Sequence, residues 1–467
     1  MAIDSLSQLP VIQQSRRQLL RSAGAGFGYL ALAGLLGRGV RKAASATSTG
    51  STPTLQLAAK TPHFAAKAKR VIFLFMQGAV SQMDTWEYKP MLQASDGKTA
   101  TGGGRLTASK FKFSQYGETG TWMSELIPHT AQHVDKFCFL RGLYTDTPAH
   151  PQAVIQLHTG TALASLTRPS MGAWLLYGLG SQNEDLPGYI TINPPPTFGG
   201  TTNYGSAFLP AYYQGMRIND MGYVPNLQAK APSVLQRKQL DLVQSMNRDL
   251  GAAPGAPDEL DGVIASYELA FKMQDKVPAL LDFTSEPQNV RDAYGVKPGP
   301  AGSFARQCLM ARRLSEAGVR FVEICHPGWD QHRDLHKGLI RNTTATDQPT
   351  AALLADLEQR GLLDETLVVF GSEFGRLPTA QGPDGRDHNI TGYSMWLAGA
   401  GVKPGFSFGA TDDVGMHAVD GRMHTNDLHA TLLALMGLDH ELLTYNYAGR
   451  DFRLTDVAGT VCQEIFA

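Results

Sequence analysis

A carboxylate and two imidazoles stand directly behind one apolar stretch of this sequence. The stretch, Val319 to Cys325, is mostly apolar or β-branched and contains no Gly or Pro, which predicts a β-strand. Asp330, His332 and His336 follow soon after the Pro-Gly pair that ends it. In an open parallel sheet, ligands bind where the carboxyl ends of strands meet loops. Because zinc and similar ions prefer carboxylate and imidazole ligands, we predict a metal or anion site here, with capping of backbone groups as the alternative.

Two later stretches bring further donors to the same edge of the predicted sheet. The apolar run Thr366 to Gly371 predicts a strand, and Glu373 follows it. Asp387 and His388 stand just before a second run, Tyr393 to Leu397. Their oxygen and nitrogen atoms would complete a metal site. An Asp-His dipeptide is common and by itself does not indicate a site. Its place at the same edge of the sheet as the first cluster favours a functional site.

Two arginines and one earlier carboxylate belong to the same hypothesis. Arg376 and Arg386 stand beside these donors and could hold an oxyanion by paired hydrogen bonds. The run Lys69 to Met76 predicts a central parallel strand, and Asp84 is the carboxylate in the loop behind it. Asp84 is therefore predicted either to bind the metal or to cap the next turn.

Residues at the start of a predicted helix are candidates for contact with substrate. Tyr144 to Pro151 opens a helical stretch that ends at Gly160, with Pro early and Gly last, as helices commonly begin and end. A helix N-terminus that points into a cleft favours anions. Thr145, Thr147 and His150 are therefore predicted to contact substrate, with capping of the helix by the threonines as the alternative.

Strands that alternate with helices predict an α/β fold with a doubly wound, mostly parallel sheet, helices on both faces and irregular insertions. The expected strands are residues 69–76, 137–140, 188–192, 319–325, 366–371 and 393–397. The expected helices are residues 123–133, 144–160, 169–180, 234–250, 260–274, 303–317, 348–360 and 427–436. Residues 69–467 form one expected domain, with an insertion at about 193–300.

The first 46 residues are expected to be an export signal rather than part of the fold. Arg16 and Arg17 precede a Gly- and Ala-rich apolar run, and Ala44 to Ala46 offers small residues to a signal peptidase. The paired arginines are typical of the twin-arginine type. We therefore predict a periplasmic or secreted protein with a flexible linker at 47–68. No stable membrane span is expected after signal removal, and a tethered N-terminal helix is the alternative.

Composition narrows the range of partners. Lys plus Arg (41) nearly balance Asp plus Glu (42), so the overall charge does not indicate a nucleic-acid partner. The four cysteines contain no CxxC pair. One disulfide could form in an oxidising compartment, but the spacing does not fix its partners.

Three motifs carry a family resemblance. They are Gln77 to Ser81 before Asp84-Thr85, the GSEFGR of Gly371 to Arg376, and the GRDHN of Gly385 to Asn389. With the paired arginines they resemble the bacterial domain-of-unknown-function 1501 family, over about residues 15 to 457. The order of elements is similar, more loosely, to the alkaline phosphatase and sulfatase superfamily. The resemblance implies a sulfatase-like fold and a divalent metal, with zinc, calcium and manganese as the candidates.

The superfamily resemblance also implies roles for single residues. Glu373 takes the place of a metal-ligating Asp, and Phe374 stands in the place of the second ligand. His388 is similar to a later zinc-ligating histidine, and Asp330 with its neighbouring histidines resembles an Asp-plus-His pair. At the end of the first strand, Gln77 stands where a ligating Asp is implied.

The nucleophile is the point where the sequence departs from the sulfatase pattern. Leu157 to Gly160 is similar to the end of the sulfatase signature, which places the modified-Cys nucleophile near His150, and no Cys stands there. Formylglycine chemistry is therefore not expected. The remaining candidates are water activated by the metal, or one of the side chains of Thr145, Thr147, Ser81 and His150.

We therefore expect an exported metal-dependent hydrolase of phosphate or sulfate esters, with esters of polysaccharides among its substrates. A catalytically inactive relative that binds a glycan or a partner protein is the alternative, favoured by the missing nucleophile. The expected catalytic residues are Thr147, His150, Arg376 and Arg386. The expected metal ligands are Asp84, Asp330, His332, His336, Glu373, Asp387 and His388.

Overall fold

The computed structural model describes residues 57–467, except 164–165, 225–226, 228–231, 252–259, 298 and 300–301. The expected signal peptide and the first part of the expected linker lie outside these residues. Residues 57–68 lie against the body of the protein, where Lys60 donates its backbone N–H to the Leu179 carbonyl at 2.8 Å and Phe64 donates to that of Gly437 at 3.2 Å. Among the described helices, none combines the length and the apolar composition that a membrane span requires.

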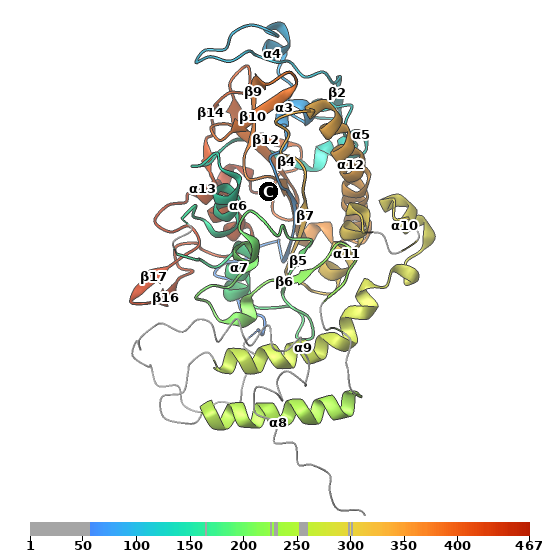
Figure 1. Ribbon diagram of the computed structural model, residues 1–467, viewed down its shortest axis with the longest axis vertical. Helices are drawn as coiled ribbons and strands as arrows, with labels where there is room; N and C mark the ends of the chain where they lie inside the picture. Colours follow the sequence, from blue (N-terminus) through green and yellow to red (C-terminus); the bar gives the residue numbers. More distant parts are fainter. Residues whose placement is uncertain are drawn as a thin grey trace, which may run out of the picture.

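A nine-stranded sheet forms the centre of the fold (Figure 1). In spatial order its path is β12 (Phe406–Phe408), β4 (Phe137–Tyr144), β11 (Tyr393–Gly399), β8 (Thr366–Gly371), β1 (Arg70–Met76), β7 (Phe321–His326), β5 (Tyr189–Ile192) and β6 (Met216–Ile218), with β15 (Met423–His424) paired to β4. β11 is antiparallel to both of its neighbours, and the other pairings in this sheet are parallel. The expected α/β fold with a mostly parallel sheet is therefore confirmed.

Helices cover both faces of the sheet, and the alternation along β1 shows why. Its even-numbered residues, Ile72 to Met76, pack into one core, and its odd-numbered residues, Val71 to Phe75, pack into another. A strand buried on both faces is apolar throughout, which explains the continuous run in the sequence. Figure 1 shows the covering helices on opposite sides of the sheet. The first core includes α11 (Phe304–Glu316) and α12 (Leu335–Gln359), and the second includes α6 (His150–Thr159), α7 (Met171–Leu179) and α13 (Thr425–Leu435).

Smaller elements surround this three-layer body. The expected insertion contains the helices α8 (Ser233–Gly251), α9 (Leu260–Leu281) and α10 (Gln288–Tyr294). Three short helices, α3 (Gln82–Thr85), α4 (Pro90–Ala94) and α5 (Pro128–Ala131), lie between β1 and β4 in the chain. The separate hairpins are β2 (Phe113–Tyr116) with β3 (Thr121–Ser124), β9 (Gly375–Gln381) with β10 (Gly385–Asn389), β13 (Ala410–Thr411) with β14 (Ala418–Asp420), and β16 (Tyr445–Tyr447) with β17 (Arg450–Phe452).

Several expected helices differ from the structure. The stretch expected to be helical from Tyr144 becomes a helix only at His150, since Tyr144 still belongs to β4. The helix expected at 123–133 was wrong, because residues 121–124 pair with β2 as strand β3 and α5 begins only at Pro128. The helix expected at 348–360 begins earlier, at Leu335, and α12 continues through Pro349. Proline removes one helical hydrogen bond, but the fully buried Leu339 and Leu353 anchor α12 on both sides of it.

The cysteines belong to the two cores. Cys308 lies in the first core, and Cys138, Cys325 and Cys462 lie in the second. All four are free thiols, so the disulfide that the sequence left open is not formed. Burial raises the pKa of the Cys308 and Cys325 thiols well above the ordinary value, and both behave as small apolar side chains.

Candidate metal centre

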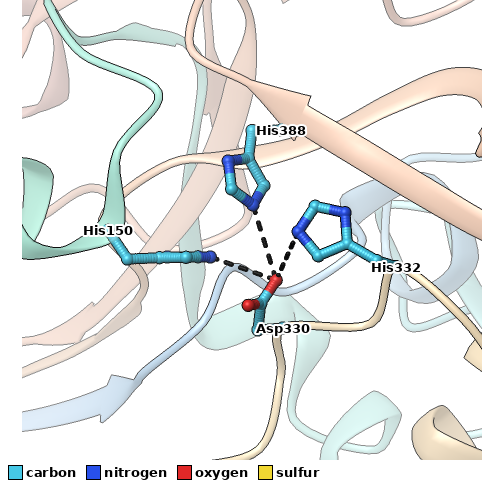
Figure 2. Close-up of side chains that lie close together, drawn as sticks. All are labelled: His150, Asp330, His332 and His388. Atoms are coloured by element: carbon cyan, nitrogen blue, oxygen red, sulfur yellow. Dashed lines mark hydrogen bonds and ion pairs between the residues drawn. The ribbon is translucent and has the colours of Figure 1, made fainter.

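Four ionisable side chains converge beside the carboxyl ends of the central strands (Figure 2). They are His150, Asp330, His332 and His388, and one ligand atom of each lies within 4.8 Å of the others. The Nε2 atoms of the histidines approach a single oxygen, Oδ1 of Asp330, at 3.1 Å for His150, 2.9 Å for His332 and 3.4 Å for His388. We call these four residues the metal cluster. Three imidazole nitrogens and a carboxylate are a donor set that suits a divalent transition metal ion.

The sheet assembles the metal cluster from three distant parts of the chain. β7 and β8 flank β1 as parallel neighbours, so the loops behind their carboxyl ends lie at one edge. Asp330 and His332 follow β7, and His388 lies on β10 in the hairpin that follows β8. His150 is the first residue of α6, and its side chain points at the same oxygen of Asp330 (Figure 2). These positions explain why residues 150, 330 and 388 meet in space.

A buried ion pair fixes α6 against β7. His158 on α6 places its Nε2 atom 2.7 Å from Oε1 of Glu323 on β7, and the Tyr189 hydroxyl donates to Oε2 of Glu323 at 3.1 Å. Burial alone would lower the pKa of His158, but the charge of Glu323 outweighs burial and raises it. Since α6 carries His150 and β7 leads to Asp330, this pair holds together the two elements that supply half of the metal cluster.

Each histidine of the metal cluster has its other ring nitrogen held by the protein. Nδ1 of His150 donates to Oε1 of Glu373 at 2.7 Å, and Nδ1 of His388 donates to the Pro148 carbonyl at 2.6 Å. Nδ1 of His332 lies against Oε1 of Gln381. An acceptor at Nδ1 fixes the proton there, so the Nε2 lone pair is free to point at the centre of the cluster. Metal-binding histidines are commonly oriented in this way.

The residues present fit a metal ion. Nε2 of His150 is buried and makes no hydrogen bond, although it lies 3.1 Å from Asp330 Oδ1. A buried polar atom of this kind is costly unless something else satisfies it. Three nitrogen donors favour zinc and also accommodate manganese, whereas calcium prefers oxygen ligands throughout. Of the expected ions, the donor set therefore fits zinc best and calcium least.

The electrostatics of the metal cluster favour positive charge. Burial alone would raise the pKa of Asp330, but His150, His388 and Arg376 beside it hold that pKa well below its usual range. Burial alone would lower the pKa of His150, but the carboxylates of Asp330 and Glu373 outweigh burial and raise it to about 9. The two carboxylates therefore favour positive charge at His150, and a metal ion that binds there competes with a proton for the Nε2 atom.

A second layer of buried groups supports the metal cluster. Oε1 of Glu373 accepts the backbone N–H of Gly78 at 3.0 Å, so one carboxylate joins the loop behind β1 to His150. The guanidinium of Arg376 is fully buried and donates to Asp330 Oδ1 at 2.7 Å and to the Ala79 carbonyl at 3.2 Å. Glu373 therefore orients His150, and Arg376 orients Asp330, from the buried side of the metal cluster.

Arg386 and Asp84 lie away from the metal cluster. Nε of Arg386 donates to Oδ2 of Asp84 at 2.8 Å, and Ser81 donates to the same oxygen at 2.5 Å. Both charged side chains are buried, and Arg386 together with Ser81 lowers the pKa of Asp84 although burial alone would raise it. Asp84, expected as a metal ligand, therefore lies outside the metal cluster. The guanidinium groups of Arg376 and Arg386, expected to contact substrate, are buried against the protein.

Three other expected residues lie at the edge of the metal cluster or outside it. His336 is on α12, where its ring stacks on Phe111 with 4.7 Å between centroids. Asp387 is half exposed, and its Oδ1 lies 3.9 Å from Nδ1 of His332. Thr147 precedes α6, and its hydroxyl accepts the backbone N–H of Ala149 at 3.3 Å. Only Thr147 among the expected catalytic groups is a hydroxyl close to His150 in the chain.

Sequence reasoning did not find the groups that hold the histidines. Gln381 and the Pro148 carbonyl carry no signal in the sequence, because their role depends on the β9–β10 hairpin and on the turn before α6. Two aromatic rings beside His150, Phe198 and Phe374, were also not assigned a role in positioning it. For Phe374, its place in the GSEFGR motif was the available signal.

Solved structures that are similar to this chain come from the alkaline phosphatase and sulfatase group. Alkaline phosphatase from the Antarctic bacterium TAB5 is 10% identical, with a TM-score of 0.33 and coverage of 80% of this chain and 99% of that one. A protein in the alkaline phosphatase superfamily from Vibrio parahaemolyticus is 10% identical, with a TM-score of 0.37 and coverage of 92% and 78%. The PsFucS1 sulfatase from Pseudoalteromonas sp. is 14% identical, with a TM-score of 0.33 and coverage of 80% and 69%. At these TM-scores the similarity supports no statement about the chemistry of this chain.

A comparison with protein-family models assigns the chain to a family. No curated protein matches the chain. The model described as "Protein of unknown function (DUF1501)" matches residues 68–466, which is most of the sequence and includes all four residues of the metal cluster. The chain therefore belongs to the DUF1501 family.

Proposed function

We propose that this protein is an exported, metal-dependent hydrolase of phosphate or sulfate esters, including esters carried by polysaccharides. One observation carries the proposal. The Nε2 atoms of three histidines converge on one oxygen of Asp330, while each Nδ1 faces an acceptor of the protein. Such pre-oriented imidazoles around a carboxylate are typical of a metal site.

The residues divide into those that would hold the ion and those that orient them. His150, Asp330, His332 and His388 would hold it, and Glu373 fixes the ring of His150. A bound divalent ion supplies Lewis-acid chemistry, which polarises an ester oxygen and makes water more acidic. The side chains of Asp330 and His332 are 38% and 32% exposed, so this face of the metal cluster is open to a substrate.

Few side chains of the protein are placed to act as the nucleophile or to neutralise the charge of the ester. Thr147 has a partly exposed hydroxyl three residues before His150 and is the candidate nucleophile among the expected side chains, with water as the other candidate. Arg376 and Arg386 are themselves buried and direct their donors at backbone carbonyls and at the carboxylates of Asp330 and Asp84. Neither guanidinium is therefore placed to neutralise the charge of an anionic ester.

That last observation favours a second candidate, a catalytically inactive protein that keeps the metal cluster for binding a glycan or a partner protein. Hydrolysis of an anionic ester commonly uses arginine or lysine to stabilise developing charge. Here the two expected arginines stabilise the loops behind β1 and β8 instead.

A metal analysis combined with an ester panel tests the proposal. Purified protein is expected to contain about one zinc or manganese ion per chain and to hydrolyse at least one aryl phosphate, phosphodiester or sulfate ester. A chelator should abolish hydrolysis, and added metal should restore it. Stoichiometric metal without turnover on the whole panel, or metal-free and fully folded protein, would exclude the hydrolase and support the binding protein.

Export is proposed from the sequence alone, because Arg16 and Arg17 belong to a twin-arginine pattern. In the full chain, replacing both residues (Arg16→Lys and Arg17→Lys) is expected to retain the protein in the cytoplasm as an uncleaved precursor. Cell fractionation with immunoblotting measures this, and Arg21→Lys, outside the pair, is the matched control. Unchanged export of the double variant would contradict the proposed route.

A further inference from the structure

Phe198 has an unusual backbone conformation for its residue type. Its φ angle is 55°, in the left-handed region that glycine and asparagine adopt far more readily than a bulky aromatic residue. Strained residues of this kind persist where the surrounding structure holds them, and they occur often at binding and catalytic sites. The backbone conformation of Phe198 must therefore have a physical cause, and it indicates a functional role.

The cause lies in the loop that follows β5. The buried side chain of Asn203 donates from Nδ2 to the Phe198 carbonyl at 2.9 Å. The next residue, Gly199, has a φ of 97°, and a Cβ atom there would lie 2.2 Å from Oδ1 of Asn203. This turn is therefore closed by Asn203 and needs glycine behind Phe198, so the strained conformation is built into the loop.

The conformation places the Phe198 ring on a residue of the metal cluster. The Phe198 and His150 rings are nearly parallel, at 19°, with 5.4 Å between their centroids. Phe374 stacks on His150 as well, at 30° and 4.7 Å. Two aromatic rings therefore contact His150 while Glu373 holds its Nδ1 atom. These contacts restrict rotation of the imidazole and keep Nε2 directed at Asp330.

We propose that Phe198 is a positioning residue of the metal centre. Its ring fixes the plane of the His150 imidazole and excludes water from that face, which strengthens metal binding without contact to the ion. The inference rests on the proposed function, because it requires that the metal cluster binds a metal. Packing of the loop alone would not need the ring to lie parallel to His150.

The test compares matched aromatic replacements in full-length protein. Phe198→Leu keeps an apolar side chain but removes the planar ring, and Phe198→Tyr keeps the ring. Phe208→Leu is the matched control, because Phe208 lies in the same loop region and stacks on Tyr447 at 17° and 5.0 Å rather than on the metal cluster. Zinc affinity is measured by competition with a chelating dye, and thermal unfolding is measured on the metal-free proteins.

Phe198→Leu is expected to weaken zinc binding about 10- to 100-fold, the range found for groups that orient metal ligands. Phe198→Tyr should bind within about threefold of the original protein, and Phe208→Leu should lower only the unfolding temperature. Equal zinc affinity of Phe198→Leu and the original protein would overturn the positioning role while leaving the metal centre intact. An original protein that binds no zinc or manganese would instead overturn the proposed function itself.

Discussion

The double variant His332→Ala/His388→Ala is expected to lose stoichiometric metal binding and ester hydrolysis while keeping its fold. These two histidines supply two of the three nitrogen donors that face Asp330. Their side chains are 32% and 15% exposed, so alanine there removes donors without opening a cavity in either core. Ion pairs of partly exposed groups contribute only about 0–1 kcal/mol each, which keeps the loss of stability small.

Unfolding measured with and without metal separates the loss of binding from a loss of fold. An ion present at 100 times its dissociation constant stabilises a folded protein by about 2.7 kcal/mol. The original protein should show this increase in its free energy of unfolding, and the double variant should show none. The metal-free forms of both proteins should unfold at similar temperatures.

A histidine control is needed because exposed imidazoles bind zinc without a built site. His129 and His417 are exposed and lie outside the metal cluster, so His129→Ala/His417→Ala removes the same number of imidazoles. This control should bind metal as the original protein does. Metal binding retained by the His332/His388 variant, or lost equally in the control, would contradict the assignment of the cluster.

The central strands could be predicted from the sequence, because they have a simple signature. β1, β7 and β8 are buried on both faces, so each appears in the sequence as a mostly apolar run followed by glycine or polar residues. The ends of the helices and strands were harder to predict. The helix expected at about 348–360 begins at Leu335 in the structure, because the packing of its buried face decides where it starts.

The same logic located much of the candidate site, including His388 just before a strand and His150 at the start of a helix. Asp330 and His332 follow β7 closely, and the structure places both in the metal cluster. His336 stands only a few residues further on, but α12 has already begun and turns its ring to Phe111. Position in the chain thus predicts the neighbourhood of a side chain, and the local backbone decides its direction.

The charged residues that support the metal cluster show the same limit of prediction from sequence. Glu373 was expected to ligate a metal, and in the structure it accepts hydrogen bonds from Gly78 and from His150 instead. Arg376 was expected to face substrate, and in the structure it donates to Asp330 from behind. In both cases the residue type and its region could be predicted. The side of the cluster on which each lies depends on the loop behind β1, whose shape the sequence does not specify on its own.

The loop behind β1 is also the place of the second large effect: Gly78→Ala is expected to disrupt the metal cluster although none of its four residues is replaced. Gly78 has a φ of 108°, and a Cβ atom there would lie 2.4 Å from the backbone nitrogen of Asp330 and 3.1 Å from its Cβ atom. The nearest obstacle is backbone, so a rotamer change cannot relieve the clash. The segment that carries Asp330 and His332 must therefore move away from β1, and the Gly78 N–H must move relative to Glu373.

Gly103→Ala separates the clash from the cost of the backbone conformation. Gly103 has a φ of 99° and no atom within 4 Å of its Cβ position, so alanine there has only the left-handed penalty of about 1–2 kcal/mol. Gly78→Ala adds overpacking of about 1–3 kcal/mol and should therefore lower the free energy of unfolding more than the control. It should also abolish the stabilisation by metal, which Gly103→Ala should retain. Metal binding by Gly78→Ala with the original affinity would show that the close contact of the two loops is not what positions Asp330, and the metal cluster would then need another support.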